Sequence, residues 1–470
     1  MRRNFNQLSL SDVYEECCKL FDNDKPKFLQ LLESTTDITD FIPLTFYNAF
    51  YRRFGRNREY PLEGFVSAIM LQKIFSIPSD TLLILFLIMS RELREFCGFD
   101  KVPDASKFTR FKQDFIEHIQ NLFDILVDCT EPMCRKMDAE LADMLIYDPS
   151  GIEAYVTENN PKFTNSLIKR IKAAYKDNPK VDPYKMSYGL MPSHARADDN
   201  IKQMYINGHF CYAHKFGMLV NGLGIVRHIA FFDDDFKTKH PEIIIEKKSD
   251  SPEEDKTIGD STSLQPVLND FFEIHPAFCY GTFLGDTSFD KADHYTFLKD
   301  QCKFKKVLIP INQRNSSSLP PVGYNEYGYP TCPNDNSLAM KRNGFAGGKG
   351  RTPRIKWTCP KFDDCSCESP CSTAKFGRTT YTYDNMEFRM FPGIARDCDE
   401  WIELYKKRCV IERSINHLKS NMCVADRKSR NTLTAKADLL FAGIAQLFTV
   451  VVAHTIKYPT LFRSLKPLFA

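Results

Sequence analysis

The sequence has little net charge and no apolar run long enough to span a membrane. Its 63 Lys and Arg residues nearly balance its 60 Asp and Glu residues, so the formal net charge is only +3. Bulk charge therefore neither requires nor excludes a nucleic-acid partner. The longest apolar runs, 81–89 and 439–453, fall short of the roughly 20 residues that a bilayer-spanning helix needs. We predict that both are buried helices and that the protein has no membrane partner.

The sequence also lacks a secretory signature, internal repeats and long low-complexity tracts. MRRNFNQLSLSD at the start carries two arginines, but no apolar segment follows them, so we expect a cytoplasmic protein without a signal peptide. In that reducing compartment the 16 cysteines should be thiols or metal ligands and not disulfides. At 470 residues the chain exceeds the size that one core usually serves, which predicts two or three domains.

Hydrophobic periodicity predicts an α/β fold behind an all-helical N-terminal domain. Strand-length apolar runs at 142–148, 214–234, 277–286 and 305–312 alternate with helical stretches at 263–274 and 291–301, a pattern typical of a mixed sheet flanked by helices. The predicted segments are 1–135, a helical domain suited to DNA binding; 138–312, the first part of the α/β core; 313–398, a Cys-rich insertion; 399–457, the second part of the core; and 458–470, a C-terminal tail.

The N-terminal segment contains three predicted helices, two of them with capping signals. The helices are expected at 64–75, 81–96 and 111–127, and PSD (78–80) and PDAS (103–106) are typical helix starts. Lys107, Arg110 and Lys112 follow the second of these caps. They suit a helix that is offered to DNA phosphates, but an ordinary solvated face explains them equally well. A last apolar helix is expected at about 434–456.

One predicted helix carries four polar side chains on a narrow stripe. In YKKRCVIERSINHLK (405–419), Tyr405, Arg408, Glu412 and Lys419 follow one another at intervals of three, four and seven. At roughly 100° of turn per residue, all four lie within about a sixth of the helix circumference. An apolar stripe lies beside them, so the polar stripe borders the buried side and Glu412 should point towards the strand ends of the sheet.

Three carboxylates are candidates for one site. Asp148 follows the apolar run LADMLIY and Asp286 follows FCYGTFLG, so each is expected at the carboxyl end of a strand, where open α/β sheets place ligands. Together with Glu412 they would repel one another without a cation. Oxygen ligands alone suit Mg²⁺ or Mn²⁺, and two such ions about 4 Å apart promote phosphodiester transfer. The three acids therefore predict nucleic-acid chemistry.

Other acids compete for these roles, because a single Asp after a strand is usually a turn residue or a helix cap. We expect Asp143 inside its strand, and Asp290 as the cap of a helix that starts near Lys291. Asp233, Asp234 and Asp235 also follow a strand and are the most serious competitors. Glu412 could instead pair with Arg408 on a solvated helix face.

The spacing Tyr405-x2-Arg408-x3-Glu412-x6-Lys419 resembles the Y-R-E-K signature of bacterial insertion-sequence transposases of the DDE class. DPSGIEAYV around Asp148 and GDTSFD around Asp286 resemble the two Asp regions of the same family, and residues 55–115 resemble its helical N-terminal domain. The sequence departs from the simplest pattern in its long insertion and in Pro149, where many relatives have a small hydroxylated residue.

The resemblance implies a ribonuclease-H-like core in which Asp148, Asp286 and Glu412 bind two Mg²⁺ or Mn²⁺ ions. It implies that Tyr405, Arg408 and Lys419 bind DNA, that the enzyme cuts at element ends and joins 3′-OH ends to target DNA, and that it acts as a dimer in the synaptic complex. Two alternatives stay open: a ribonuclease-H-like nuclease that cuts without joining, and an inactive DNA-binding relic.

The insertion holds a cluster of thiols. Cys359, Cys365, Cys367 and Cys371 could bind a structural Zn²⁺ through four thiolates, and Cys332 lies upstream of them. The spacing C-x5-C-x-C-x3-C lacks the paired C-x2-C of common zinc sites, so unliganded thiols are the alternative.

Overall fold

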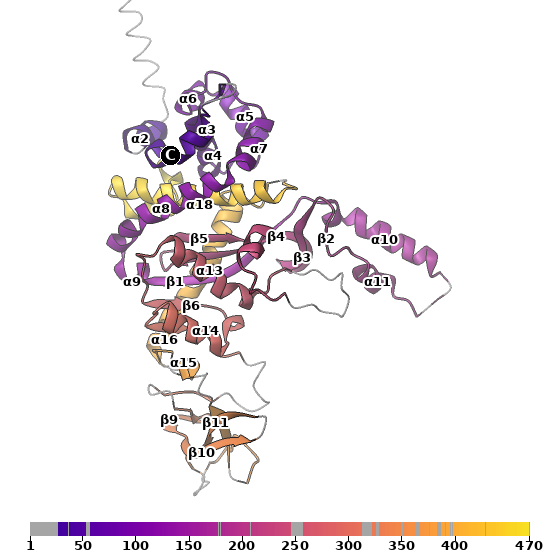
Figure 1. Ribbon diagram of the computed structural model, residues 1–470, viewed down its shortest axis with the longest axis vertical. Coiled ribbons are helices and arrows are strands. Elements are labelled where there is room, and N and C mark those ends of the chain that lie inside the picture. Colours follow the sequence, from indigo (N-terminus) through magenta and orange to yellow (C-terminus); the bar gives the residue numbers. More distant parts are fainter. Residues whose placement is uncertain are drawn as a thin grey trace, which may run out of the picture. The chain divides into compact units, whose positions relative to one another are not determined.

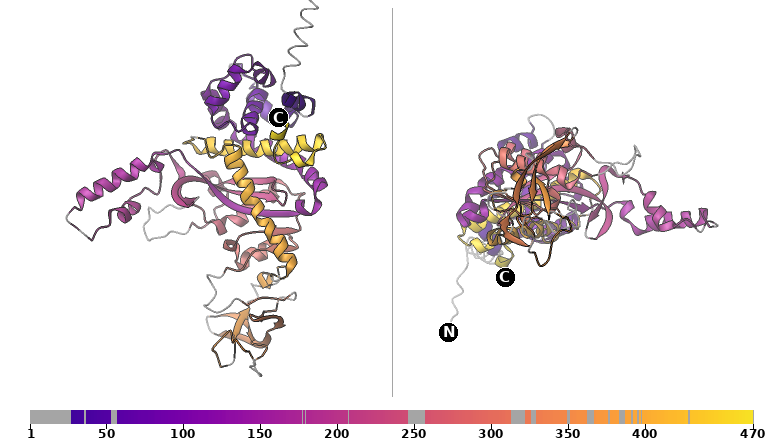
Figure 2. Two further views of the ribbon diagram at one scale, coloured as in Figure 1. Left: turned by 180° about the vertical axis from the view of Figure 1, so that it is seen from behind. Right: turned by 90° about the horizontal axis from the view of Figure 1, so that it is seen from below.

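The chain forms two compact units, each assembled from more than one segment. Unit 1 comprises Met1–Leu126, Asn421–Asp426 and Ala437–Ala470, and unit 2 comprises Val127–Ser420 and Arg427–Lys436. The computed structural model in Figures 1 and 2 describes residues 27–469, except 36, 53–56, 177, 179, 207, 246–256, 313–321, 326–328, 349–350, 362–366, 376, 383–386, 391, 395, 397 and 428.

Unit 1 is helical. Its helices are α2 (Lys27–Thr35), α3 (Leu44–Phe50), α4 (Leu62–Ile74), α5 (Asp80–Met89), α6 (Arg91–Phe96), α7 (Ala105–Asp114) and the first part of α8 (Ile116–Met137), together with most of α18 (Thr432–Thr455). Phenylalanine rings from α3, α4, α7 and α18 pack against one another in its core, among them Phe46, Phe65, Phe111 and Phe441.

Two helices that we predicted as continuous, at 81–96 and 111–127, are broken, and both predicted caps are confirmed. The helix expected at 81–96 ends at Ser90, whose hydroxyl accepts the Leu93 N–H and starts α6. Ser79 caps α5, and the Asp104 carboxylate caps α7 by accepting two backbone N–H groups. A side-chain oxygen that accepts a free N–H of the first helical turn stabilises the start of a helix, so the local sequence signals were sufficient here.

A buried ionic cluster lies in unit 1. Lys112 Nζ is 2.9 Å from Asp438 and 3.1 Å from Asp80, and Lys73 Nζ is 3.4 Å from Asp438. Both lysine side chains are fully buried. The expectation that Lys112 is offered to DNA is therefore wrong, because its ammonium group is used inside the fold.

Unit 2 is built on a mixed seven-stranded sheet, which confirms the α/β class. Its strands run in the order β2-β3-β4-β1-β6-β7, and β5 also pairs with β4. The strands are β1 (Met144–Glu153), β2 (His194–Ala195), β3 (Asp198–Ile206), β4 (His209–Asn221), β5 (Val226–Phe231), β6 (Thr282–Leu284) and β7 (Lys306–Leu308). β1 pairs antiparallel with β4 and parallel with β6, and β6 pairs parallel with β7.

Helices cover both faces of this sheet. On one face, α13 (Asp260–Ile274) packs against β1, where the hydroxyl groups of Tyr147 and Ser263 are 2.6 Å apart in the main apolar core. Seen from behind, the helical segment that begins at Asp399 crosses the sheet (Figure 2). Within it, α17 (Cys409–Asn416) contacts β1 and β4. Because neighbouring residues of a strand point to opposite faces, Tyr147 points towards α13 and Asp148 points to the other face.

Three further parts of unit 2 lie outside this core. α10 (Pro161–Ala174) and α11 (Pro183–Gly189) project beside β2 and β3 (Figure 1). α14 (Ala292–Thr296) lies between β6 and β7 in the chain. In the insertion, β8 (Thr331–Cys332) pairs with β9 (Asp335–Ala339), and β10 (Lys341–Gly348), β11 (Arg351–Thr358) and β12 (Thr379–Thr382) form a small sheet.

α18 is long and apolar enough to span a membrane by length and composition, but 94% of its apolar window is buried. Burial of this kind is typical of a core helix.

His228 on β5 gives the fold a pH dependence. Burial lowers the pKa of His228 to about 4, and its ring nitrogens have no hydrogen-bond partner among the described residues. The unfolded chain takes up a proton near pH 6.5, whereas the folded chain does so only near pH 4. We therefore expect stability to fall as the pH drops from 6.5 to 4, by up to about 3 kcal/mol from this group.

His228→Phe should remove that part of the loss, as measured by urea unfolding at pH 5 and pH 8. The variant should gain more stability at pH 5 than at pH 8. His194→Phe, at a partly exposed histidine, is the control for the same substitution outside the core. An equal effect of His228→Phe at both pH values would contradict the assignment.

Candidate active site

Asp148 lies in the middle of β1 and not at its end as we expected. β1 pairs with β6 only from Met144 to Ile146, but it continues along β4 as far as Glu153. The apolar run ends at Tyr147 because β1 leaves its parallel neighbour there, and not because the strand stops. Asp148 therefore lies on a continuous strand, directly past the point where the parallel pairing with β6 ends.

Asp286 and Glu412 come from neighbouring elements. Asp286 follows β6 after one glycine, and its carboxylate accepts the Thr287 N–H at 2.6 Å, so it also caps a short helix. Glu412 lies in α17, which contacts β1 and β4. The side chains of Asp286 and Glu412 are about half exposed, at 43% and 56%, whereas Asp148 is 19% exposed. The site is therefore open to solvent on the side of Asp286 and Glu412.

The guanidinium group of Arg408 meets all three carboxylates. Its Nη2 is 3.4 Å from Asp148 Oδ2 and 3.8 Å from Asp286 Oδ2, and its Nη1 donates to Glu412 Oε1. The pairing of Arg408 with Glu412 that we weighed as an alternative is thus present, but the same guanidinium also reaches the two aspartates. The structure brings the three candidate acids together around one cation.

Burial and the neighbouring charges shift the pKa values in this cluster. Burial raises the pKa of Asp148 to about 7; Arg408 opposes the shift, and Asp286 and Glu412 add to it. Burial alone would lower the pKa of Arg408, but the carboxylates outweigh it and raise that pKa. Because burial disfavours the ionised form of Asp148, a further cation bound at this cluster would stabilise that ionised form.

Tyr405 and Lys419 lie on either side of the acids. The Tyr405 hydroxyl donates to the Gly285 carbonyl at 3.5 Å, and Lys419 Nζ donates to Ser150 Oγ at 2.8 Å. Burial lowers the pKa of Lys419 to about 8. Tyr405, Arg408 and Lys419 therefore contact β1 or the segment that follows β6. Glu412 joins them through its pair with Arg408.

The helix that carries the stripe is less regular than we predicted. α16 (Asp399–Tyr405) is followed by a 3₁₀ turn at Lys406–Arg408, then α17, then a π-helical turn at His417–Asn421. The 3₁₀ turn winds the chain more tightly than an α-helix and the π turn more loosely. The four side chains still reach the same edge of the sheet.

The competing acids lie elsewhere. Asp143 precedes β1 as the C-cap of α9 (Ala139–Ala142), so the expectation that it lies inside the strand is wrong. Asp290 does not cap α14; it pairs with Arg389 and accepts from Tyr295. Asp233 caps α12 (Asp234–Lys239) and pairs with Lys436. Since their carboxylates have these other partners, they are not alternatives to the cluster around Arg408.

The donor set fits Mg²⁺ or Mn²⁺. Asp148, Asp286 and Glu412 offer only carboxylate oxygens, and these are the ligands that both ions prefer. The shared contact with Arg408 shows that the three acids already converge on one positive charge.

The zinc prediction for the insertion is only partly covered by the structure. Cys365 lies outside the described residues. Burial raises the pKa of Cys371, and the thiols of Cys332 and Cys359 raise it further. Cys332 and Cys359 are buried. Cys332 thus lies close to Cys371 in the fold, although it is far from it in the sequence. Zinc binding by Cys359, Cys365, Cys367 and Cys371 stays a prediction.

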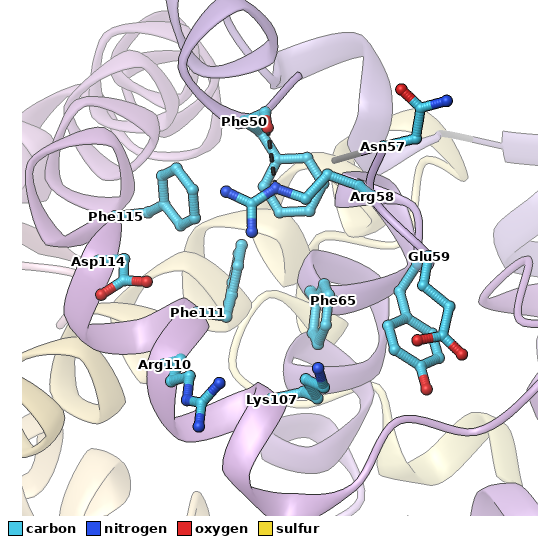
Figure 3. A pocket seen from close by; sticks show the side chains of 11 residues that line it. Phe50, Asn57, Arg58, Glu59, Phe65, Lys107, Arg110, Phe111, Asp114 and Phe115 are labelled. Carbon is cyan, nitrogen blue, oxygen red and sulfur yellow. Dashed lines mark hydrogen bonds between the residues drawn. The ribbon is translucent and has the colours of Figure 1, made fainter. Parts of the chain in front are cut away.

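Unit 1 has an open recess beside α7 (Figure 3). Its wall is aromatic, and Arg58 lies over the Phe50 ring at 4.7 Å and donates to the Phe50 carbonyl. Lys107 and Arg110 line it as well, but so do two acids, Glu59 and Asp114. Because the rim carries both signs of charge, Lys107 and Arg110 still fit either a DNA contact or a solvated face.

Sequence reasoning missed two features of unit 2. Ser150, which binds Lys419, lies two residues beyond Asp148 and therefore on the same face of β1; the period of the strand could have found it. The exposed basic helix α10 was also missed, although PKFTNSLIKRIKAA contains four Lys or Arg residues and no acid.

Residues 17–114 match the family model of a transposase domain (DUF772). Among curated proteins, none matches the sequence. The match lies in the first segment of unit 1, outside the acid cluster. It supports a transposase family, a transposase-type function and thus a DNA-processing enzyme.

Proposed function

We propose that this protein is a DDE-type transposase. It cuts DNA at the ends of an insertion sequence and joins the 3′-OH ends to target DNA by divalent-metal phosphodiester transfer. The observation that carries the proposal is the convergence of Asp148, Asp286 and Glu412 on Arg408. The transposase-domain match in the same chain favours this chemistry over other uses of three acids.

The strand order supports a ribonuclease-H-like core. β5, β4 and β1 form an antiparallel set, and β6 and β7 extend it on the other side of β1 as parallel strands. Asp148 lies on the strand that joins these two sets, and Asp286 follows the adjacent strand. The two acids are thus carried by neighbouring strands, which fixes the distance between them.

The residues of the cluster have different proposed roles. Asp148, Asp286 and Glu412 would hold the metal ions, which when bound supply activation of the attacking oxygen and stabilisation of the leaving 3′-oxygen. Arg408 and Lys419 neutralise phosphates, and Tyr405 stacks on or hydrogen-bonds to a nucleotide. Arg408 keeps the acids together without DNA, and its guanidinium is also suited to a phosphate.

DNA binding should also involve α10. Lys162, Lys169 and Arg170 on this helix are exposed and no acid lies within it, so it offers positive charge to the DNA backbone. The triple change of these residues to Gln should weaken DNA binding at all sequences. It should also flatten the slope of log K against log salt by roughly 0.9 for each lost phosphate contact.

A matched control changes Lys291, Lys303 and Lys305 to Gln. These three lysines are exposed in the same unit, so the net charge changes equally. Filter binding or fluorescence anisotropy at several salt concentrations should show little change in slope for this control. Equal slopes for both triple variants would mean that α10 does not contact DNA.

The function is tested with a labelled duplex that carries the DNA flanking the gene, incubated with wild-type protein and Mg²⁺ or Mn²⁺. Cut ends that become joined to a target plasmid support the transposase. Cutting without joining would favour a nuclease, and DNA binding without cutting would favour an inactive relic.

A further inference from the structure

A second cluster of ligand-type side chains lies at the end of β1. In the part of the chain that the structure describes, Glu153, His209 and Cys211 each offer one ligand atom, and these atoms all lie within 4.8 Å of one another. His209 Nε2 is 3.5 Å from Glu153 Oε2. None of the three belongs to the cluster around Arg408.

The pairing of β1 with β4 explains why these side chains meet. Glu153 is the last residue of β1 and lies opposite Ala213 on β4. Ala213, Cys211 and His209 are two residues apart along β4, so their side chains share one face with Glu153. Ala213 is small, which leaves room for Glu153 to reach along the strand towards Cys211 and His209.

The chemistry of the three donors selects a particular class of metal ion. A thiolate, an imidazole and a carboxylate together are typical of Zn²⁺ and similar transition metals, whereas Mg²⁺ prefers oxygen alone. Bonds of roughly 2.0 to 2.3 Å to a tetrahedral zinc place the ligand atoms about 3.3 to 3.8 Å apart. The distance between His209 and Glu153 already falls in this range, and the Cys211 ligand atom lies within 4.8 Å of both.

We propose that Glu153, His209 and Cys211 form a zinc-type site. Cys211 is buried, whereas the side chains of Glu153 and His209 are about half exposed, so an ion can enter from solvent. Three protein ligands leave the fourth position to water. Binding displaces the proton of the Cys211 thiol and ties the β3–β4 hairpin to the end of β1, the strand that carries Asp148.

The test measures metal content and cobalt spectra of the full-length protein. Chelator-treated protein is reloaded with Zn²⁺, dialysed and analysed by mass spectrometry, and is separately loaded with Co²⁺. We expect Cys211→Ser and His209→Ala each to hold one equivalent of zinc less than wild type. Cys211→Ser should also lose part of the thiolate-to-cobalt charge-transfer absorption.

The controls separate this site from other ligands. His194→Ala removes a histidine on β2 that lies 3.0 Å from an acid, Asp199, and Cys279→Ser removes an exposed thiol; both should keep the wild-type metal content. Cys359→Ser, in the insertion, should leave the equivalent that depends on Cys211 in place. Because His209 is exposed, His209→Ala should fold even if Cys211→Ser does not.

Wild-type zinc content and cobalt spectrum in both Cys211→Ser and His209→Ala would overturn the site. Loss in Cys211→Ser with full retention in His209→Ala would overturn it as well, because the thiol would then bind metal without the histidine. Neither readout depends on DNA cleavage, so the result is independent of the proposed transposase activity.

Discussion

Asp148→Asn, Asp286→Asn and Glu412→Gln should each lower the rate of DNA cutting by about a thousandfold or more. Each change keeps the size of the side chain but removes a negative charge and a proposed metal ligand. The reason is geometric: the three carboxylates meet around a single guanidinium, so the loss of any one of them breaks the arrangement. Gel analysis of cut and joined products under Mg²⁺ and Mn²⁺ measures the effect.

The losses should not come from unfolding, and they should not add. Burial raises the pKa of Asp148 to about 7, so the charged form is disfavoured in the fold and Asp148→Asn should not lower the melting temperature. Residues that hold one catalytic unit are strongly non-additive. The double variant of Asp148 and Glu412 should therefore be about as slow as either single variant, with DNA binding retained in all of them.

Asp143→Asn and Asp234→Asn are the matched controls. Asp143 directly precedes β1 and Asp234 follows β5 closely, so both resemble the catalytic candidates in sequence, yet each has its own partners, Arg135 and Lys237. Both variants should cut DNA at close to the wild-type rate. If one of the three triad variants keeps full activity while a control loses it, the proposed site is wrong.

The convergence of these side chains could be predicted from the sequence because the spacing that indicates it is local. The spacing of Tyr405, Arg408, Glu412 and Lys419 depends only on helical periodicity, and the observed contacts with Gly285, the acids and Ser150 follow from one face of one segment. The change of pitch at the 3₁₀ and π turns was not predictable from 100° per residue. The two turns change the positions of the four side chains around the helix, but the side chains still lie on one side of it.

The errors have the opposite origin, since each depends on a partner that is distant in sequence. Asp290 looked like a cap until Arg389, 99 residues away, was found to bind it. Lys112 looked exposed on an amphipathic helix, but Asp438 lies on α18 and neutralises it. Asp148 was expected at a strand end because the apolar run ends there. The run ends where β1 stops pairing with β6, whereas β1 itself continues along β4. Local patterns predict elements and caps, but they do not show which charges are paired in the fold.

Asp438→Asn should destabilise unit 1 by about 3–5 kcal/mol. Asp438 is 1% exposed and lies 2.9 Å from Lys112 and 3.4 Å from Lys73, whose side chains are fully buried. The change removes the carboxylate that both ammonium groups share. Lys112 keeps only Asp80 as an ion-pair partner among those that the structure describes. The cost arises because a buried charge without sufficient compensation is far less stable than one in water.

Urea unfolding followed by circular dichroism measures the loss, and hydrogen exchange at the amides of α4 and α7 assigns it to unit 1. Glu59→Gln breaks an exposed pair with Lys101 in the same unit and should have no measurable effect, because solvent screens such pairs. The quadruple change Lys73→Met, Lys112→Met, Asp80→Asn and Asp438→Leu removes every charge of the cluster. It should recover most of the stability, since well-packed apolar side chains often replace a buried ionic cluster without loss. Recovery would show that Asp438→Asn acts through uncompensated charge, whereas a quadruple variant as unstable as Asp438→Asn would mean that the cluster holds the helices together by its specific geometry.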